Sequence, residues 1–365
     1  MSVKLFFSKF DKRRIEIYIA GVTGAIQNKP SSLPHNDRPM LCGTCETKEN
    51  IKKRHDNILK NGLPNLYKTY IRQAQALFAE VAPRSCFSVY AADSRVRFES
   101  PTIVKSRLIK DQDAKGVLLP LDRKHHWNAL LNLKRDDRPF ESKDNKIIWR
   151  GVTTGIFQKR NPSDEYSQRF HVASLSNLAD GIDLKYSGIV QIDDDTSDIP
   201  INVIKSCIGA KMTMAEQLSS KFLLSLEGND VATGLKWMMA SNSTVLMPTP
   251  TCETWFCESA LQPWVHFIPV KQDLSDINEI YEWCLSNQET CRDIALNGKQ
   301  YVRQFLNKST EKIIIKEVVQ TYLENFDEKL KFSINERIKQ NYNYATLLIK
   351  AYKFSKSTEK WNNYV

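Results

Sequence analysis

The sequence lacks the long apolar run of a membrane-spanning helix. No stretch approaches the roughly eighteen consecutive apolar residues that such a helix needs. Near the N-terminus, Lys4, Lys9 and Lys12 interrupt the apolar residues before the core of a secretion signal forms. We therefore expect a cytoplasmic protein whose contact with a membrane is at most peripheral.

Cysteine is scarce, with eight residues scattered over a chain of 365. This number excludes a small disulfide-stapled domain and favours free thiols in a reducing compartment. Cys42 and Cys45 have the spacing of half a zinc site, but no second CxxC and no HxxxH motif supplies the remaining ligands. We expect no metal site.

The sequence also lacks the RNP, zinc-finger and helix-turn-helix patterns of nucleic-acid-binding proteins. Its 52 lysines and arginines nevertheless exceed its 42 acidic residues, for a formal net charge of +10. Such a charge favours anionic partners without choosing among phosphates, nucleic acid and acidic lipids. A non-enzymatic protein that binds nucleic acid or an anionic membrane is therefore one hypothesis.

Length and polar segments predict two domains, because 365 residues exceed what one core usually supports. A polar segment at 134–145 (KRDDRPFESKDN) marks the boundary between them. We expect an α/β domain over 1–140, a second α/β domain over 141–325 and a basic helical tail over 326–365.

Alternating strand and helix patterns predict an α/β fold with a parallel, doubly wound sheet. In the first domain, apolar spacing predicts a helix over 66–81 and a strand over 86–90 that leads to Asp93. In the second domain, the predicted strands are 146–149, 188–192, 221–226, 244–247 and 265–270, and the predicted helices are 232–240, 274–285 and 289–306. Ligands of such sheets bind beyond the carboxyl ends of the strands.

The most distinctive motif covers 221–236 (KFLLSLEGNDVATGLK), where an apolar strand turns into a helix. Free N–H groups at a helix start suit a diphosphate, and glycine permits close approach of the backbone. The candidate residues are Glu227, Gly228, Asn229, Asp230, Thr233, Gly234 and Lys236. Asn229 or Asp230 could equally be an ordinary helix cap, so the motif alone leaves both interpretations open.

A second cluster, WRGVTTG at 149–155, also ends an apolar strand. Arginine beside glycine and hydroxyl groups suits bidentate phosphate binding. The candidates are Arg150, Gly151, Thr153 and Thr154, followed by Arg160 and Arg169. Surface arginines are common, so the cluster gains its weight from the other phosphate-type turn in the same domain.

Together these segments resemble glycosyltransferase family 90, in its bacterial lipopolysaccharide-modifying branch. The segments IWRGVTTG, KFLLSLEGNDVATGLKWMMASNSTVLMP and WVHFIPVKQDLSDI occur in the family's order, within a similarity that covers roughly 86–306. The resemblance implies a GT-B-type fold, in which two Rossmann-like domains face one another across a cleft and a C-terminal helix crosses back. It also implies that the domain over 1–140 binds the acceptor and that the domain over 141–325 binds the nucleotide-sugar.

The resemblance also implies roles for individual residues. The cluster from Arg150 to Arg160 would hold uridine diphosphate, and the turn at 229–234 would wrap the nucleotide from the other side. Eukaryotic members carry an arginine near Gly234, so Lys236 would supply that charge here. Asp93 matches the family's general base, which deprotonates the acceptor hydroxyl in an inverting mechanism; Asp111 and Asp113 are competing carboxylates.

These features predict an inverting, metal-independent transferase that moves a hexose, glucose or galactose, from a UDP-sugar to lipopolysaccharide inner core. No cofactor is expected besides this donor, and the basic surface suits an anionic glycolipid acceptor at the cytosolic face of the inner membrane. Capsule, another polysaccharide or protein are alternative acceptors. Tight UDP binding would separate all of these enzymes from a non-enzymatic anion-binding protein.

Overall fold

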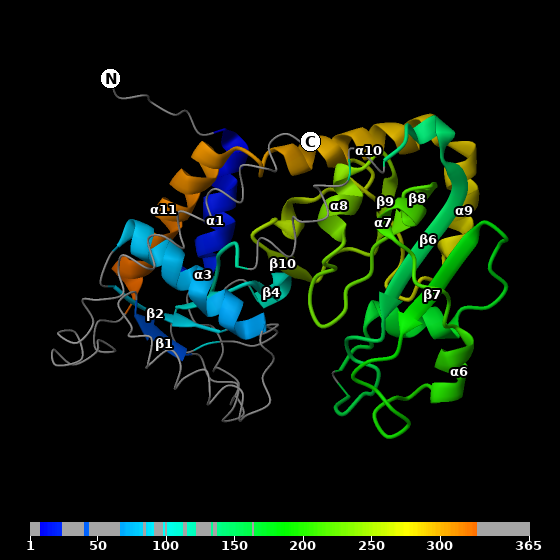
Figure 1. Cartoon of the computed structure of the whole chain (residues 1–365), viewed down its shortest axis with the longest axis horizontal. Helices are drawn as coiled ribbons and strands as arrows, with labels where there is room; N and C mark the ends of the chain where they lie inside the picture. Colours follow the sequence, from blue (N-terminus) through cyan, green and yellow to red (C-terminus); the bar gives the residue numbers. More distant parts are fainter. Residues whose placement is uncertain are drawn as a thin grey trace. The chain divides into compact units, whose positions relative to one another are not determined.

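The structure is a computed structural model that describes residues 8–23, 40–43, 66–82, 85–90, 98, 101–111, 115–121, 133, 137–162 and 164–326. These residues divide into two compact units (Figure 1). Unit 1 comprises the described residues of 1–123, together with 253–257 and those after 306; unit 2 comprises the described residues of 124–252 and 258–306. The predicted tail over 326–365 lies outside the described residues, apart from Phe326.

Unit 1 contains a four-stranded sheet in the order β1-β2-β3-β5, in which β1 is antiparallel to β2 and the other neighbours are parallel. Its strands are β1 (Met40–Gly43), β2 (Cys86–Val89), β3 (Thr102–Val104) and β5 (Gly116–Leu118), and β4 (Ser106–Leu108) pairs with β10 (Cys252–Thr254). Its helices are α1 (Lys9–Thr23), α3 (Leu66–Val81) and α11 (Lys308–Asn325), with a 3-10 turn, η2, at Ile109–Asp111. The observed α3 and β2 confirm the predicted helix over 66–81 and strand over 86–90.

The helix α11 belongs to unit 1, although the sequence placed residues up to 325 in the second domain. Its Glu311 forms an ion pair of 2.5 Å with the buried Arg14 of α1. Its Tyr322 hydroxyl accepts a hydrogen bond of 2.8 Å from the Ser88 N–H of β2. These buried polar contacts join α11 to the sheet and to α1, so tertiary pairing rather than chain order decides its unit.

Unit 2 contains a five-stranded, wholly parallel sheet in the order β11-β9-β8-β6-β7. The strands are β6 (Asp144–Val152), β7 (Ile182–Gly188), β8 (Ser220–Leu224), β9 (Thr244–Met247) and β11 (Ile268–Pro269). The helices are α6 (Ile201–Ser206), α7 (Met214–Gln217), α8 (Leu235–Ala240), α9 (Ile277–Ser286) and α10 (Gln288–Arg303), with 3-10 turns η3 (Phe140–Ser142), η4 (Gln168–Ser174) and η5 (Glu258–Ala260). This arrangement confirms the predicted α/β class and the parallel sheet.

The strand order reverses direction at β6, the first strand of this sheet. From β6 the chain goes to β7 on one side and then to β8 on the other, as in flavodoxin-like sheets. β6 and β7 lie side by side in Figure 1. The carboxyl ends of β6 and β8 therefore form the topological switch point, which is where open α/β sheets bind their ligands.

Two predicted strands were misplaced. The strand expected over 188–192 ends at Gly188 and is instead β7, whose side chains alternate between buried and half-buried positions because it is an edge strand. Val190 lies beyond it, with 40% of its surface exposed. The strand expected over 265–270 is reduced to β11, because the Trp264 N–H donates to the Phe267 carbonyl in a turn.

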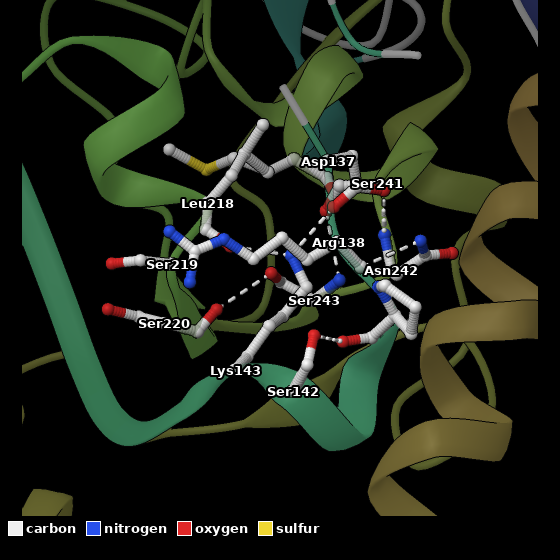
Figure 2. A network of polar contacts seen from close by, with 12 residues as sticks. Asp137, Arg138, Ser142, Lys143, Leu218, Ser219, Ser220, Ser241, Asn242 and Ser243 are labelled. Carbon is white, nitrogen blue, oxygen red and sulfur yellow. Dashed lines mark hydrogen bonds and ion pairs between the residues drawn. The ribbon is translucent and has the colours of Figure 1, made fainter. Parts of the chain in front are cut away.

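The amino ends of β6, β8 and β9 are joined by a polar network (Figure 2). The Lys143 ammonium, whose side chain is fully buried, donates to the Asp137 carboxylate and to the Leu218 carbonyl, both at 2.6 Å. The other oxygen of Asp137 accepts the Asn242 N–H at 2.8 Å. Burial lowers the pKa of Lys143, and the bond to Asp137 opposes this shift. Asp137 thus neutralises the Lys143 charge and accepts the Asn242 N–H at the amino ends of the strands, opposite the switch point.

We predict that Asp137→Ala lowers the free energy of unfolding by about 3–5 kcal/mol, because it leaves the buried ammonium without its counter-charge. Urea titration followed by circular dichroism measures the loss. Arg138→Ala is the matched control, since this neighbouring side chain is exposed. A loss below about 1 kcal/mol for Asp137→Ala would show that the network is not structural.

Candidate functional site

Two loops meet at the switch point of unit 2. The strands β6 and β8 are parallel neighbours, so the loops that follow them leave the same edge of the sheet. These loops carry residues 153–155 and 227–230, which the sequence singled out as separate phosphate-binding candidates. The structure thus brings together two of the predicted groups.

Glycine lets the two loops approach closely. The Gly155 N–H donates to the Asn229 side-chain oxygen at 3.0 Å. A Cβ atom on Gly228 would lie 2.3 Å from the Thr154 hydroxyl, and Gly155 has a φ of +108°. Larger residues would separate the loops or strain them.

Arg169, at the start of η4, connects the same two loops. Its Nε and Nη2 atoms donate to the Leu226 carbonyl at 3.2 and 3.1 Å. Its Nη1 atom donates to the Val152 carbonyl at 3.0 Å and to the Thr154 hydroxyl at 2.8 Å. Burial lowers the pKa of Arg169 to about 10, although Asp230 opposes the shift, so the guanidinium is charged at neutral pH.

Trp149 and Gly151 of the motif at 149–155 pack beside Arg169. The guanidinium carbon lies 6.0 Å from the centre of the buried Trp149 ring, within the range of a cation–π contact. A Cβ atom on Gly151 would lie 2.4 Å from this ring, so only glycine leaves room for it. The Tyr186 hydroxyl donates to the Arg169 carbonyl at 2.5 Å, and the Tyr186 ring packs edge-on against Trp149.

The side chains of Arg150 and Thr153 contact β7 and segments that follow it, rather than the loop at 227–230. The Arg150 guanidinium forms an ion pair of 2.6 Å with Asp183 of β7 and donates to the Ala210 carbonyl. The Thr153 hydroxyl exchanges two hydrogen bonds of 2.8 Å with the backbone of Val190. Arg150 thus joins β6 to β7 and to Ala210, and Thr153 holds the segment after β7 against the end of β6.

Glu227 fastens the loop after β9 to the loop after β8. Its carboxylate accepts the N–H groups of Thr251 and Cys252 at 3.0 and 3.1 Å and the Thr251 hydroxyl at 2.5 Å. Its own N–H donates to the side chain of Gln168, which in turn donates to Gln272. No local motif in the sequence marks Gln168, Gln272 or Thr251, which join this arrangement only through tertiary contacts.

The second half of the glycine motif behaves differently from the first. The helix α8 begins at Leu235 with Gly234 as its N-cap and has no side-chain cap bond, so Asn229 and Asp230 are not its caps. Thr233 is exposed. Lys236 is fully buried and forms an ion pair of 2.8 Å with the buried Glu258, so its ammonium lies in the core rather than at the loops.

Arg160 is the candidate cation that faces solvent. It lies in the loop between β6 and η4, where its N–H donates to Asp164. Its guanidinium has no hydrogen-bond or ion-pair partner within the part of the chain that the structure describes. Asp93 lies outside the described residues, as does Asp113.

The described residues contain no group of three or more His, Cys, Asp or Glu side chains that could hold a metal ion. None of the described helices combines the length and the apolar character needed to cross a bilayer.

Known proteins with similar sequences point to one family. The sequence model of glycosyl transferase family 90 matches residues 130–343. O-glucosyltransferase LpsA of Dichelobacter nodosus is 32% identical over 253 residues, which are 67% of this chain and 68% of that protein. Protein O-glucosyltransferase 2 of Danio rerio is 35% identical over 86 residues, and protein O-glucosyltransferase 3 of Homo sapiens is 30% identical over 110. These matches cover 24% and 30% of this chain and only 17% and 21% of the two animal proteins.

We predict that Gly228→Ala lowers the free energy of unfolding by about 1–3 kcal/mol, because the added methyl group collides with Thr154 and Arg169. Gly188→Ala is the matched control in the same sheet, since its nearest neighbour would be 4.0 Å from the new Cβ. Urea titration of both variants measures the difference. Equal stability of the two variants would contradict the close approach of the loops.

Proposed function

Because this chain belongs to glycosyltransferase family 90, we propose that it is a glycosyltransferase that moves a hexose from a UDP-sugar to lipopolysaccharide inner-core oligosaccharide. Glucose is the favoured hexose, since the similar proteins are named as O-glucosyltransferases. The observation that carries the proposal is the meeting of the two glycine loops at the switch point.

The two loops lie where a sheet of this kind would bind a nucleoside diphosphate. Gly155 and Gly228 have no side chains, so the loops converge at the switch point, which is where open α/β sheets bind their ligands. The exposed guanidinium of Arg160 follows on the same loop and supplies a charge for bidentate phosphate binding. Lys236 has no part in this proposal, because its ammonium is paired with Glu258.

The acceptor is inferred from the resemblance to the lipopolysaccharide-modifying branch and from the similarity to LpsA. The formal net charge of +10 suits an anionic glycolipid at a membrane surface. A protein acceptor is the second candidate, because segments of the chain are similar to protein O-glucosyltransferases. The acceptor's own chemistry does not alter the donor site proposed here.

The proposed reaction is a single inverting displacement. The acceptor hydroxyl oxygen attacks the anomeric carbon, the bond from that carbon to the diphosphate oxygen breaks, and the hydroxyl proton passes to the carboxylate of Asp93. The Arg160 guanidinium stabilises the negative charge on the departing diphosphate. With this protein group at the leaving group, the proposed step requires no metal ion.

Calorimetric titration with UDP, UDP-glucose and UDP-galactose, each with and without EDTA, tests the donor. We expect binding that EDTA does not weaken, because protein groups alone neutralise the diphosphate. Binding that disappears with EDTA would contradict the metal-independent step. No binding of any of the three would remove the donor site and favour the non-enzymatic anion-binding protein.

Two arginine variants localise the site in the same titration. Arg160→Ala is expected to weaken UDP binding about tenfold, because it removes a charged hydrogen bond to phosphate. Arg292→Ala is the control: this exposed arginine on α10 pairs with Glu141, which precedes β6 at the opposite edge of the sheet. Equal affinities for the two variants would exclude Arg160 from the phosphate site.

We predict that Asp93→Asn lowers kcat about 10²- to 10⁴-fold and leaves UDP affinity nearly unchanged, because the amide cannot accept the proton. Asp111→Asn is the matched control among the competing carboxylates. Single-turnover transfer assays with radiolabelled donor measure both variants. Retained turnover in Asp93→Asn would remove this residue from the base role, and loss in Asp111→Asn would transfer the role there.

A further inference from the structure

The strands β6 and β8 stop pairing before the candidate site begins. Their last register pair is Ile148 with Leu223. Val152 and Leu226 lie three or more residues beyond that pair, at the start of the two loops. Backbone hydrogen bonds between the strands therefore do not set the spacing of the loops.

The planar guanidinium of Arg169 connects the two chain segments beyond the last paired residues. The carbonyls of Val152, at the end of β6, and of Leu226, two residues beyond β8, both accept from its guanidinium, at 3.0 Å and at 3.1 to 3.2 Å. A fourth hydrogen bond reaches the Thr154 hydroxyl. The flat, five-donor fork of arginine can serve acceptors on two sides at fixed angles, which a lysine ammonium cannot do.

We propose that Arg169 is a positioning residue, which sets the spacing of the loops at 153–155 and 227–230 and does not itself bind the donor's diphosphate. The expected effect on UDP binding rests on the proposed function. The expected effect on the loops can be measured in the free protein and does not rest on it. The proposal departs from the expectation, drawn from the sequence, that Arg169 helps to bind the nucleotide's phosphates, because four of its five N–H groups already donate to protein atoms.

Thr154 is the partner through which the position of Arg169 reaches the site. Its hydroxyl accepts from Arg169, and a Cβ atom on Gly228 would touch the same hydroxyl. Its N–H donates to the Val152 carbonyl at 2.9 Å, the same oxygen that Arg169 contacts. Removing either the fork of Arg169 or the hydroxyl of Thr154 should therefore disturb one shared arrangement.

The test uses the full chain carrying Arg169→Lys, Thr154→Val, both changes together, and Thr154→Ser. Hydrogen exchange of peptides that cover 153–155 and 226–230 measures the loops in the free protein, with β7 peptides as the internal control. UDP titration at a temperature where circular dichroism shows folded protein measures the site. Wild-type protein and Arg160→Ala are titrated beside the variants.

We expect Arg169→Lys and Thr154→Val each to raise loop exchange and the UDP Kd about tenfold, with β7 exchange unchanged. The UDP Kd of the double variant should be no higher than that of the weaker-binding single variant, because both changes break the same arrangement. Thr154→Ser should restore near wild-type values. Arg169→Lys keeps the positive charge, so a direct phosphate contact would survive it in large part.

Three results would overturn the proposal: unchanged loop exchange in Arg169→Lys, a UDP Kd in that variant within twofold of wild type, or independent effects that multiply in the double variant. If wild-type protein does not bind UDP, the proposed function fails, and the exchange measurement still decides whether Arg169 positions the loops.

Discussion

The divergence of β6 and β8 beyond their last paired residues is the constraint on which the site depends. Backbone carbonyls that leave a parallel sheet at a switch point lose their neighbours and must find other donors. Here the Arg169 guanidinium supplies them for Val152 and Leu226. Glycine at 155 and 228 then allows the loops to meet above it. Charge, planarity and missing side chains together hold the two loops close to one another at the switch point.

The amino and carboxyl ends of the strands in the unit 2 sheet differ in how their charged side chains are paired. At the amino ends, Lys143 and Asp137 form a buried, satisfied network that joins three strands (Figure 2). In the loop after the carboxyl end of β6, the exposed Arg160 guanidinium has no hydrogen-bond or ion-pair partner among the described residues. A satisfied buried pair resists disruption, whereas an unsatisfied exposed charge is available to a ligand. The stabilising network and the proposed donor site therefore lie at opposite ends of the strands.

Unit 1 depends on buried ion pairs between segments that are distant in the chain. Arg107 of β4 donates to Glu253 of β10 at 2.7 and 2.9 Å, and Arg14 of α1 pairs with Glu311 of α11. All four side chains are buried, so loss of any one would leave an uncompensated charge. These pairs specify that segments after residue 252 and after residue 306 join the N-terminal sheet. A boundary drawn from local polarity at 134–145 has no access to such information.

The sequence by itself determined the α/β class, the family and the two loops of the site. The helix over 66–81 and the strand over 244–247 were predicted with their observed ends, because each depends on a local pattern of apolar residues. Only the tertiary structure decided which arginines and lysines face the loops. Arg150, Arg169 and Lys236 each have partners elsewhere in the chain, and the Arg169 bond to Leu226 spans 57 positions. Local spacing specifies where a side chain leaves the backbone, but long-range packing specifies what it contacts.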